Sequence, residues 1–338
     1  MHNPTASPDH RSRLRVSTSL RLPSPRVSFV DQIDSDRVQL LGFRSRPKRS
    51  DIDVLHVHHL DAIAPIRKTR GARRVGAALT FALRLRASRV PLVRTISGAD
   101  DPTQGGRADQ LANRIINAAA SALVAVDSTL ASQRGSKVTQ IPFGHYRERF
   151  VGYPRSTVHT GRVMCTAAYL GGPVDPIIQA FADTRKPGLS LRVVGPANAA
   201  RASDLKARLS PLVDRASALI EQPSDGALVL ELSAAEILVL GQASELADVH
   251  LLFLALSLDR PVLVPRSPLT VAVAAAVGPG WVFVYDKPLS GADIDRAVTQ
   301  ARDTERQAQP MLEGRAHAAT SAQYAAIFEA VSRAGRER

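Results

Sequence analysis

The sequence predicts an α/β protein of two domains, each a parallel β-sheet with helices on both faces. The chain has 338 residues, which is about two domains at roughly 150 residues each. Short apolar runs bounded by turn residues alternate with longer helical stretches, and this alternation is typical of parallel sheets. The alternation runs twice, with a break near residues 144–161, so we expect each half of the chain to form its own sheet.

In the first half, the expected strands are short apolar runs that end at polar or turn residues. They lie at 26–30, 38–43, 53–58, 91–96, 122–126 and 138–141. Longer stretches between them predict helices at 62–87, 105–121 and 128–133. The residues before the first of these strands include arginine and serine but no apolar core segment, so we expect residues 1–25 to be a disordered basic tail.

The second half repeats the same rhythm of strands and helices. Its expected strands lie at 162–168, 191–194, 218–221, 236–240, 261–264 and 281–285. Its expected helices lie at 176–183, 202–209, 226–232, 249–258, 271–277, 291–302 and 321–333. We therefore predict Rossmann-like domains at residues 26–150 and 151–320, followed by a helical segment at 321–338. Ligands bind outside the carboxyl ends of the strands in such sheets, so functional residues should directly follow strands.

Charge is divided unevenly between the two halves. The first 150 residues hold 25 basic and 12 acidic side chains, whereas the remainder holds 19 of each. The single cysteine excludes an intramolecular disulfide framework and a cysteine-based zinc site. The sequence has no apolar run of about 18 residues that would cross a membrane, and residues 1–25 do not read as a secretory signal, so we expect a cytoplasmic protein.

Four segments of the sequence carry a family resemblance. They are residues 53–59 (DVLHVHH), 91–95 (PLVRT), 141–147 (IPFGHYR) and 254–265 (LALSLDRPVLVP), the last followed by VGPGW at 277–281. In this order and spacing they resemble the GT-B glycosyltransferases of bacterial exopolysaccharide and glycolipid synthesis, of the family 4/1-like type.

This resemblance implies a GT-B architecture, in which two Rossmann-like domains face a cleft. The C-terminal domain would bind a UDP- or GDP-linked sugar, and the N-terminal domain a lipid-linked or polysaccharide acceptor. The expected activity is the transfer of a hexosyl group without a metal ion or other cofactor. The helix at 321–338 would cross back and pack on the N-terminal domain.

Two departures from the family pattern keep a second function open. The loop at 169–174, after the first strand of the donor domain, lacks the cation that usually grips the diphosphate. The second of two glutamates in the donor helix is replaced by Leu254. The alternative is therefore a non-catalytic partner or regulator of another transferase, and a basic nucleic-acid-binding protein is favoured less.

The catalytic candidates follow expected strands of the first half. His58 and Asp61 come after the strand at 53–58, and His145 comes after the strand at 138–141. Such residues could contact the donor sugar or move a proton. Alternation places His56 and His58 on the same face of the sheet, where one of them could instead be a core histidine. We expect His56 to be the structural one.

The donor-binding candidates follow strands or precede a helix, where backbone N–H groups and the helix dipole suit a diphosphate. Arg266 is the nearest replacement for the missing loop cation. The alternatives are a plain interdomain linker for residues 144–147 and a helix cap for Ser244. The candidates are Gly144, Arg147, Gly195, Gln242, Ser244, Glu245 and Arg266.

A basic stretch without any acidic residue spans residues 62–98. We expect it to face an acceptor or an anionic membrane, such as the inner face of the plasma membrane, at about 1 kcal/mol for each basic residue. The alternatives are a solvated helix and a nucleic-acid surface, but few aromatic residues accompany the arginines, so nucleic acid is not expected as a partner. The predicted membrane-side or acceptor-side residues are Arg67, Lys68, Arg70, Arg73, Arg74 and Arg84. Val75, Ala78, Leu79 and Ala82 share the other side of the expected helix.

Overall fold

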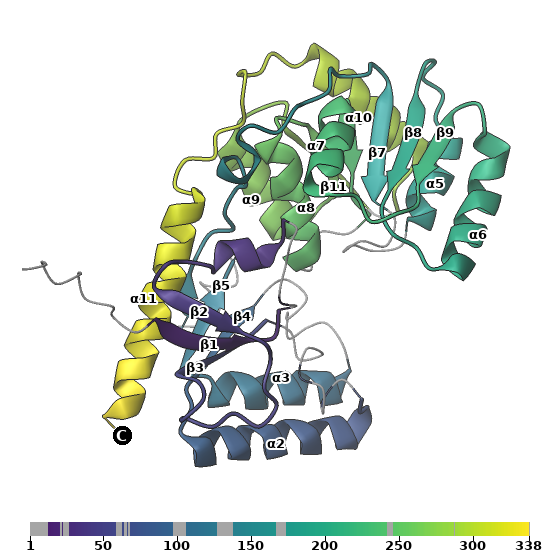
Figure 1. The fold of residues 1–338 in the computed structure, drawn as a ribbon. Coiled ribbons are helices and arrows are strands. Elements are labelled where there is room, and N and C mark those ends of the chain that lie inside the picture. The colour runs from purple at the N-terminus through teal and green to yellow at the C-terminus, as the bar shows by residue number, and fades with distance from the viewer. Residues whose placement is uncertain are drawn as a thin grey trace, which may run out of the picture.

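The computed structural model contains two parallel β-sheets of six strands each (Figure 1). The first sheet has the strand order β2-β1-β3-β4-β5-β6, and the second has β12-β11-β10-β7-β8-β9. Neighbouring strands in both sheets run parallel, which confirms the predicted α/β class. The structure describes residues 13–20, 22, 27–58, 63, 66, 68–96, 106–126, 138–166, 174–241, 246–286 and 288–337.

The first sheet is covered on one face by a pair of long helices, α2 (Gly71–Ser88) and α3 (Arg107–Ala119). Leu55 and Val57 point to this pair, whereas the alternate residues Val54 and His56 point to the other face. That second face is covered by the last helix, α11 (His317–Arg336), which packs against β1 and β3. The strands are β1 (Leu14–Thr18), β2 (Val38–Leu41), β3 (Val54–Val57), β4 (Leu92–Ile96), β5 (Ala122–Ala125) and β6 (Val138–Gln140).

The first strand of this sheet lies where the sequence predicts a tail, so that prediction is wrong for residues 14–18. β1 pairs with both β2 and β3, and Val16 is completely buried. The strand alternates polar and apolar residues, and its polar members are satisfied by partners far along the chain: Arg15 donates to Asp53 and to the carbonyl oxygen of Ser50. The predicted strand at 26–30 is also wrong, because Phe29–Gln32 form a 3₁₀ helix, η1, capped by Ser28. Residues 1–12 lie outside the described part of the chain.

The second sheet contains the strands and helices that the sequence predicts, with ends shifted by a few residues. Helix α8 between β10 and β11 is buried along the whole of residues 249–257. The strands are β7 (Arg162–Thr166), β8 (Ser190–Val194), β9 (Ala216–Leu219), β10 (Ile237–Val239), β11 (Val262–Pro265) and β12 (Val282–Tyr285). The helices are α5 (Asp175–Ala182), α6 (Ala199–Leu209), α7 (Asp225–Ala234), α8 (Leu246–Ser257), α9 (Pro268–Val277) and α10 (Gly291–Asp303). Two short 3₁₀ helices, η4 (Glu148–Phe150) and η5 (Ser210–Leu212), complete the described elements.

One continuous apolar core reaches from the first sheet to the second. Val16 of β1 belongs to the same buried cluster as Met164 of β7. Phe143 and Tyr146, in the segment that connects the sheets, lie in that cluster, and so does Phe328 of α11. The connecting segment is therefore part of the hydrophobic core and not a solvated linker.

Truncating Phe328 tests the packing of α11 on the first sheet. Phe328 is fully buried, with its ring 5.6 Å from the imidazole of His56. We expect Phe328→Ala to lower the free energy of unfolding by about 3–5 kcal/mol, measured by urea denaturation. Leu83→Ala, at an exposed position of α2, should change it by less than about 0.5 kcal/mol. Equal effects of the two substitutions would contradict the packing described here.

Candidate active site

The carboxyl edge of the first sheet brings two polar residues together. His58 directly follows β3, and Ser19 directly follows β1, the neighbouring strand. Ser19 Oγ lies 2.7 Å from His58 Nδ1 and also accepts the backbone N–H of His58 at 3.1 Å. Ser19 lies in the segment predicted to be a tail and was therefore not among the predicted site residues, although the alternating run before it was a signal for a strand. Asp61, the other candidate here, lies outside the described residues.

The contacts of Ser19 favour one proton arrangement on His58. Since Ser19 Oγ already accepts the backbone N–H, its own hydroxyl proton can be donated to Nδ1 of the ring. The neutral imidazole then carries its proton on Nε2. This tautomer makes Nε2 of His58 a hydrogen-bond donor.

His56 is a core histidine with both ring nitrogens satisfied. Its Nδ1 lies 3.0 Å from Thr18 Oγ1 and its Nε2 lies 2.9 Å from Thr95 Oγ1. The ring also makes edge contacts with Tyr324 and Phe328 of α11. Burial lowers the pKa of His56 to about 3, so the ring is neutral at physiological pH. Its contacts on β1, β4 and α11 give it a role in packing.

Gly144 makes a close contact within the protein. Its N–H donates to Gln32 Oε1 of η1 at 2.8 Å. A Cβ atom at this position would collide with Gln32 and with Thr320 of α11. Glycine is needed here because the connecting segment, η1 and α11 approach one another closely.

His145 is buried beside Gly144 and faces a carboxylate. Its backbone N–H donates to the carbonyl oxygen of Arg315 at 2.8 Å, and its Nδ1 lies 3.1 Å from Glu148 Oε2. Burial lowers the pKa of His145, and the carboxylate of Glu148 partly opposes that shift. These contacts orient the ring within the connecting segment.

Arg147 is half-buried and is held by the segments that follow α8 and α10. Its Nη2 donates to the carbonyl oxygen of Pro310 at 3.0 Å and lies 3.4 Å from Asp259 Oδ1. Arg155 contacts the other oxygen of the same carboxylate at 2.8 Å. Asp259, just beyond α8, is thus bound by two arginines, and the charge of Arg147 is compensated within the protein.

Helix α8 fixes the connecting segment through contacts that the sequence did not reveal. Tyr146 Oη lies 2.6 Å from His250 Nδ1, and the backbone N–H of Tyr146 donates to Ser257 Oγ at 2.8 Å. The ring of Phe143 stacks on Phe253 with 5.4 Å between centroids. These residues lie more than 100 positions apart in the chain, so no local pattern could have paired them.

The donor-side candidates of the second sheet follow its strands, as expected. Gly195 ends β8 with φ 140°, a conformation that favours glycine, and its N–H donates to the carbonyl oxygen of Leu219. Arg266 follows β11, and its Nε lies 2.9 Å from Asp286 Oδ1, which follows β12. Leu254, at the position of the missing glutamate, is fully buried in α8. Gln242, Ser244 and Glu245 lie outside the described residues, as does the loop at 169–173.

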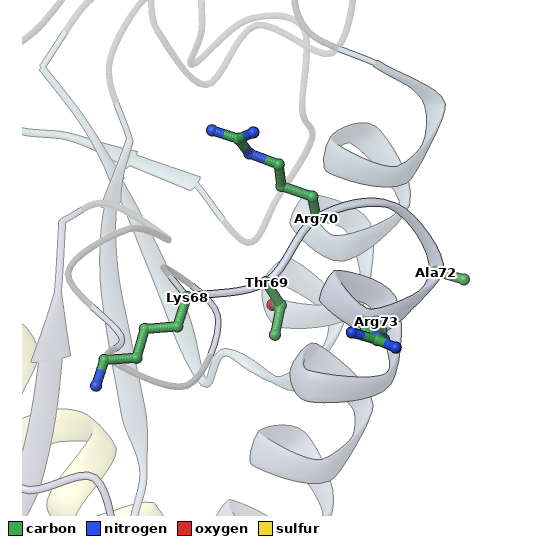
Figure 2. Close-up of a pocket in the computed structure, with 5 residues that line it drawn as sticks. All are labelled: Lys68, Thr69, Arg70, Ala72 and Arg73. Carbon is green, nitrogen blue, oxygen red and sulfur yellow. The ribbon is translucent and has the colours of Figure 1, made fainter.

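The basic candidates at and before α2 have different surroundings. Lys68, Arg70 and Arg73 line a hollow of about 690 Å³ at the start of α2 (Figure 2). Arg74 instead pairs with Asp109 of α3 at 2.6 Å and is only 13% exposed, so its charge is compensated within the protein. Arg84 lies exposed further along α2, and Arg67 lies outside the described residues.

The two sides of α2 also differ from the prediction. Its buried face consists of Ala78, Phe81 and Leu85. Leu79 and Leu83 are exposed, by 48% and 66%, and lie one turn apart on the opposite side. The predicted grouping of Ala78 with Leu79 on one side of the helix is therefore wrong. Ala78 lies on the narrow buried face that contacts the rest of the domain, and Leu79 lies outside that face.

Comparison with known proteins identifies the family. Over 271 residues, which are 79% of this chain and 76% of the relative, the sequence is 31% identical to the GDP-mannose:glycolipid 4-beta-D-mannosyltransferase of Xanthomonas campestris pv. campestris. The chain belongs to the GT-B glycosyltransferases. No protein-family model matches it.

Solved structures share the GT-B fold with this glycosyltransferase. The Anabaena protein HepE in complex with UDP superposes with a TM-score of 0.57 at 14% identity, covering 96% of this chain and 98% of the other. A trehalose-phosphate synthase (UDP-forming) from Burkholderia xenovorans gives a TM-score of 0.51 at 12% identity, covering 84% and 73%. At this level of identity the likeness concerns the fold.

Among the described residues, no three histidine, cysteine, aspartate or glutamate side chains come together in a way that could hold a metal ion. None of the helices in that part of the chain combines the length and the apolar character needed to cross a membrane.

Buried histidines should make the fold sensitive to acid. Burial lowers the pKa of His56 to about 3 and that of His250 to about 4, both below the ordinary value near 6.5. The unfolded chain therefore binds protons that the folded chain cannot. Stability is retained above about pH 6.5 and falls as the pH drops toward 4, by up to about 1.4 kcal/mol per pH unit for each histidine. Urea denaturation at several pH values measures this slope.

Replacing His56 isolates its share of the acid sensitivity. His56→Gln keeps a hydrogen-bonding side chain between Thr18 and Thr95, but this side chain does not titrate. The free energy of unfolding should therefore depend less steeply on pH, by the uptake of about one proton. His159→Gln, at an exposed position before β7, should leave the slope unchanged. A slope that is identical in wild type and His56→Gln would contradict the assignment.

Proposed function

We propose that this glycosyltransferase moves a mannosyl group from GDP-mannose to a glycolipid acceptor. The observation that carries the proposal is the 31% identity to a GDP-mannose:glycolipid mannosyltransferase, which extends over 79% of the chain. Both sheets lie within the region of shared fold, since the HepE likeness covers 96% of the chain. We favour GDP over UDP as the nucleotide for one reason. The relative named for GDP-mannose is 31% identical to this chain, whereas the structural neighbour in complex with UDP is 14% identical.

In this proposal the second sheet binds the nucleotide at its carboxyl edge. The segment with Gln242, Ser244 and Glu245 joins β10 to the start of α8, and a helix start favours a diphosphate. Arg266 follows the neighbouring strand β11 and supplies a cation at the same edge. Its present partner, Asp286, is 81% exposed, so exchange of this carboxylate for a phosphate costs little.

At the first sheet we propose that His58 contacts the transferred sugar or its phosphate. In the reaction, the acceptor hydroxyl oxygen bonds to the anomeric carbon, and the bond from that carbon to the diphosphate oxygen breaks. The electron pair leaves with GDP, and the hydroxyl proton passes to a base. With Nε2 protonated, His58 stabilises the developing charge, and Asp61 is the candidate for the base. His145, turned toward Glu148, serves to position the connecting segment.

Turnover with defined donors tests this function. The purified protein is incubated with radiolabelled GDP-mannose and a bacterial glycolipid fraction, and the labelled lipid product is separated by chromatography. Parallel reactions contain UDP-glucose and UDP-galactose. Turnover of a UDP-sugar but not of GDP-mannose would contradict the proposed donor. Binding of GDP-mannose without turnover on any acceptor would favour the non-catalytic alternative.

Substitutions at the first sheet test the role of His58. We expect His58→Gln to lower kcat by about 100-fold, because charge stabilisation and orientation are both lost. Ser19→Ala should lower kcat by about tenfold, and Ser19→Thr, which keeps the hydroxyl group, should restore most of it. His159→Gln is the control and should leave kcat unchanged. Equal activities of Ser19→Ala and wild type would remove Ser19 from the site.

We also propose that the outer side of α2 rests on an anionic membrane, which for a glycolipid acceptor would be the inner face of the plasma membrane. Leu79 and Leu83 project from this side, the exposed Arg86 lies three residues beyond Leu83 on the same side, and no acidic residue occurs from 62 to 98. A surface that combines apolar and basic side chains binds the water–lipid interface of a membrane rich in anionic lipid.

Vesicle binding tests this surface. We expect Leu79→Ser combined with Leu83→Ser to reduce binding to phosphatidylglycerol vesicles by about tenfold in cosedimentation, because apolar burial is lost while charge is kept. Val271→Ser, an exposed apolar position on α9, is the matched control and should bind as wild type does. Equal binding of wild type to uncharged phosphatidylcholine vesicles would contradict the electrostatic part of the proposal.

A further inference from the structure

Helix α8 is followed by a left-handed turn in which the residue is an aspartate. Asp259 has a φ of 57°, a conformation in which glycine is the usual residue just after a helix. The turn is closed by backbone hydrogen bonds, from the N–H of Asp259 to the carbonyl oxygen of Leu256 at 3.1 Å and from that of Arg260 to the carbonyl oxygen of Ala255 at 3.0 Å. The carboxylate of Asp259 therefore takes no part in ending the helix.

This carboxylate is instead shared by two arginines from outside the helix. Arg147 Nη2 lies 3.4 Å from Asp259 Oδ1, and Arg155 Nη1 lies 2.8 Å from Oδ2 of the same side chain. Arg147 Nη2 also donates to the carbonyl oxygen of Pro310 at 3.0 Å. The Asp259 side chain thus holds Arg147 and Arg155 at the end of α8 and, through Arg147, the backbone of Pro310.

These contacts lie on both stretches of chain that cross between the sheets. The first crossing runs from the end of β6 to the start of β7, at residues 141–161, and contains Arg147 and Arg155. The second runs from the end of α10 to the start of α11, at residues 304–316, and contains Pro310. The shared carboxylate is therefore linked to both crossings at once, from a position on the second sheet's own helix layer.

The strength of these contacts suits a restraint that can be released. Residues 151–160 and 304–309 within the crossings are largely exposed, so core packing does not fix them. Arg147 makes only a long contact with Asp259, and its Nε is buried without a hydrogen-bond partner among the residues that the structure describes. Arg155 pairs from a position that is 42% exposed, where an ion pair is weak and is screened by salt.

Other cations near Asp259 would favour separation of the crossings once its charge is removed. Burial lowers the pKa of Arg260, the charge of Asp259 opposes that shift, and the charges of Arg306 and Arg155 add to it. Arg155 belongs to the first crossing and Arg306 to the second. Asp259 therefore offsets repulsion among cations that both crossings bring to the end of α8.

We propose that Asp259 is an electrostatic latch that restricts rotation of one sheet relative to the other. With Arg147 and Arg155 bound to it, the two crossings are held at the end of α8. When these contacts break, residues 151–160 can change their dihedral angles without disturbing the core. Higher ionic strength favours the released state, because it screens the exposed pair with Arg155. The latch acts on the motion of the chain, so it does not depend on which donor or acceptor the enzyme uses.

Distances between two spin labels, measured in the full chain by pulsed electron paramagnetic resonance, test the latch. The labels are attached at Ala118→Cys in α3 and at Val213→Cys after η5, both exposed positions, whereas the native Cys165 is buried and does not compete for label. With the latch intact we expect a narrow distribution of distances. Asp259→Asn should make it at least about twice as wide at low salt, because the charge is lost while asparagine still tolerates the positive φ.

Variants of the partner and a matched control separate the latch from a general effect of charge. Arg155→Gln should also widen the distribution, and Arg155→Lys, which keeps the charge, should not. Asp204→Asn is the matched control, because Asp204 is likewise shared by two arginines, Arg201 and Arg208, but all three lie within α6. It should leave the width unchanged. Potassium chloride at about 1 M should widen the distribution of the chain with an intact latch and have less effect on Asp259→Asn.

Three outcomes would overturn the proposal. The first is an unchanged width in Arg155→Gln, which lies on an exposed stretch and so leaves the folded core intact. The second is equal widening by Asp204→Asn and Asp259→Asn. The third is widening by Asp259→Asn that is absent in Asp259→Gly, because glycine suits the left-handed turn but has no carboxylate. That result would assign the effect to the conformation of the turn. The measurement needs no turnover, so its result is independent of the proposed donor and acceptor.

Discussion

Burial of the segment at 141–150 sets the positions of both sheets. Phe143, Tyr146 and Phe150 belong to one apolar cluster with residues of β1 and β7, and burying each aromatic ring contributes about 1.5–3 kcal/mol. Helix α8 holds the segment from one side, through Phe253 and Ser257. The arrangement of the strand edges that carry His58 and Arg266 depends on this packing.

Several arginines of this basic chain form ion pairs that join two elements of the fold. Arg74 joins α2 to α3, Arg147 joins the connecting segment to Asp259, and Arg149 joins it to Asp225 at the start of α7. Each of these charges is compensated where it stands, so it contributes little to long-range attraction. The field that an anionic ligand would meet is concentrated where partners are missing among the described residues, at the start of α2.

Most of the fold could be predicted from the sequence, because buried parallel strands are continuous apolar runs. β1 escaped detection because Arg15 and Ser17 interrupt its apolar pattern, and the Asp53 and Gly42 groups that satisfy them lie elsewhere in the chain. Ser19 was lost with that strand. Gly144 was found by its motif, but the reason for it, the close approach of Gln32, is a contact over 112 residues that no local pattern encodes. Arg74 is set apart from Arg73 by its pairing with Asp109, again a tertiary contact.

The buried connecting segment also determines how this enzyme can move. A hinge needs residues whose dihedral angles can change without breaking a core, and residues 141–150 do not meet that condition. The chain crosses between the sheets twice, at residues 141–161 and 304–316, and residues 151–160 and 304–309 within these crossings are largely exposed. Opening and closing around a substrate would therefore rotate about these exposed stretches, and the 141–150 segment would travel as a rigid part of one body.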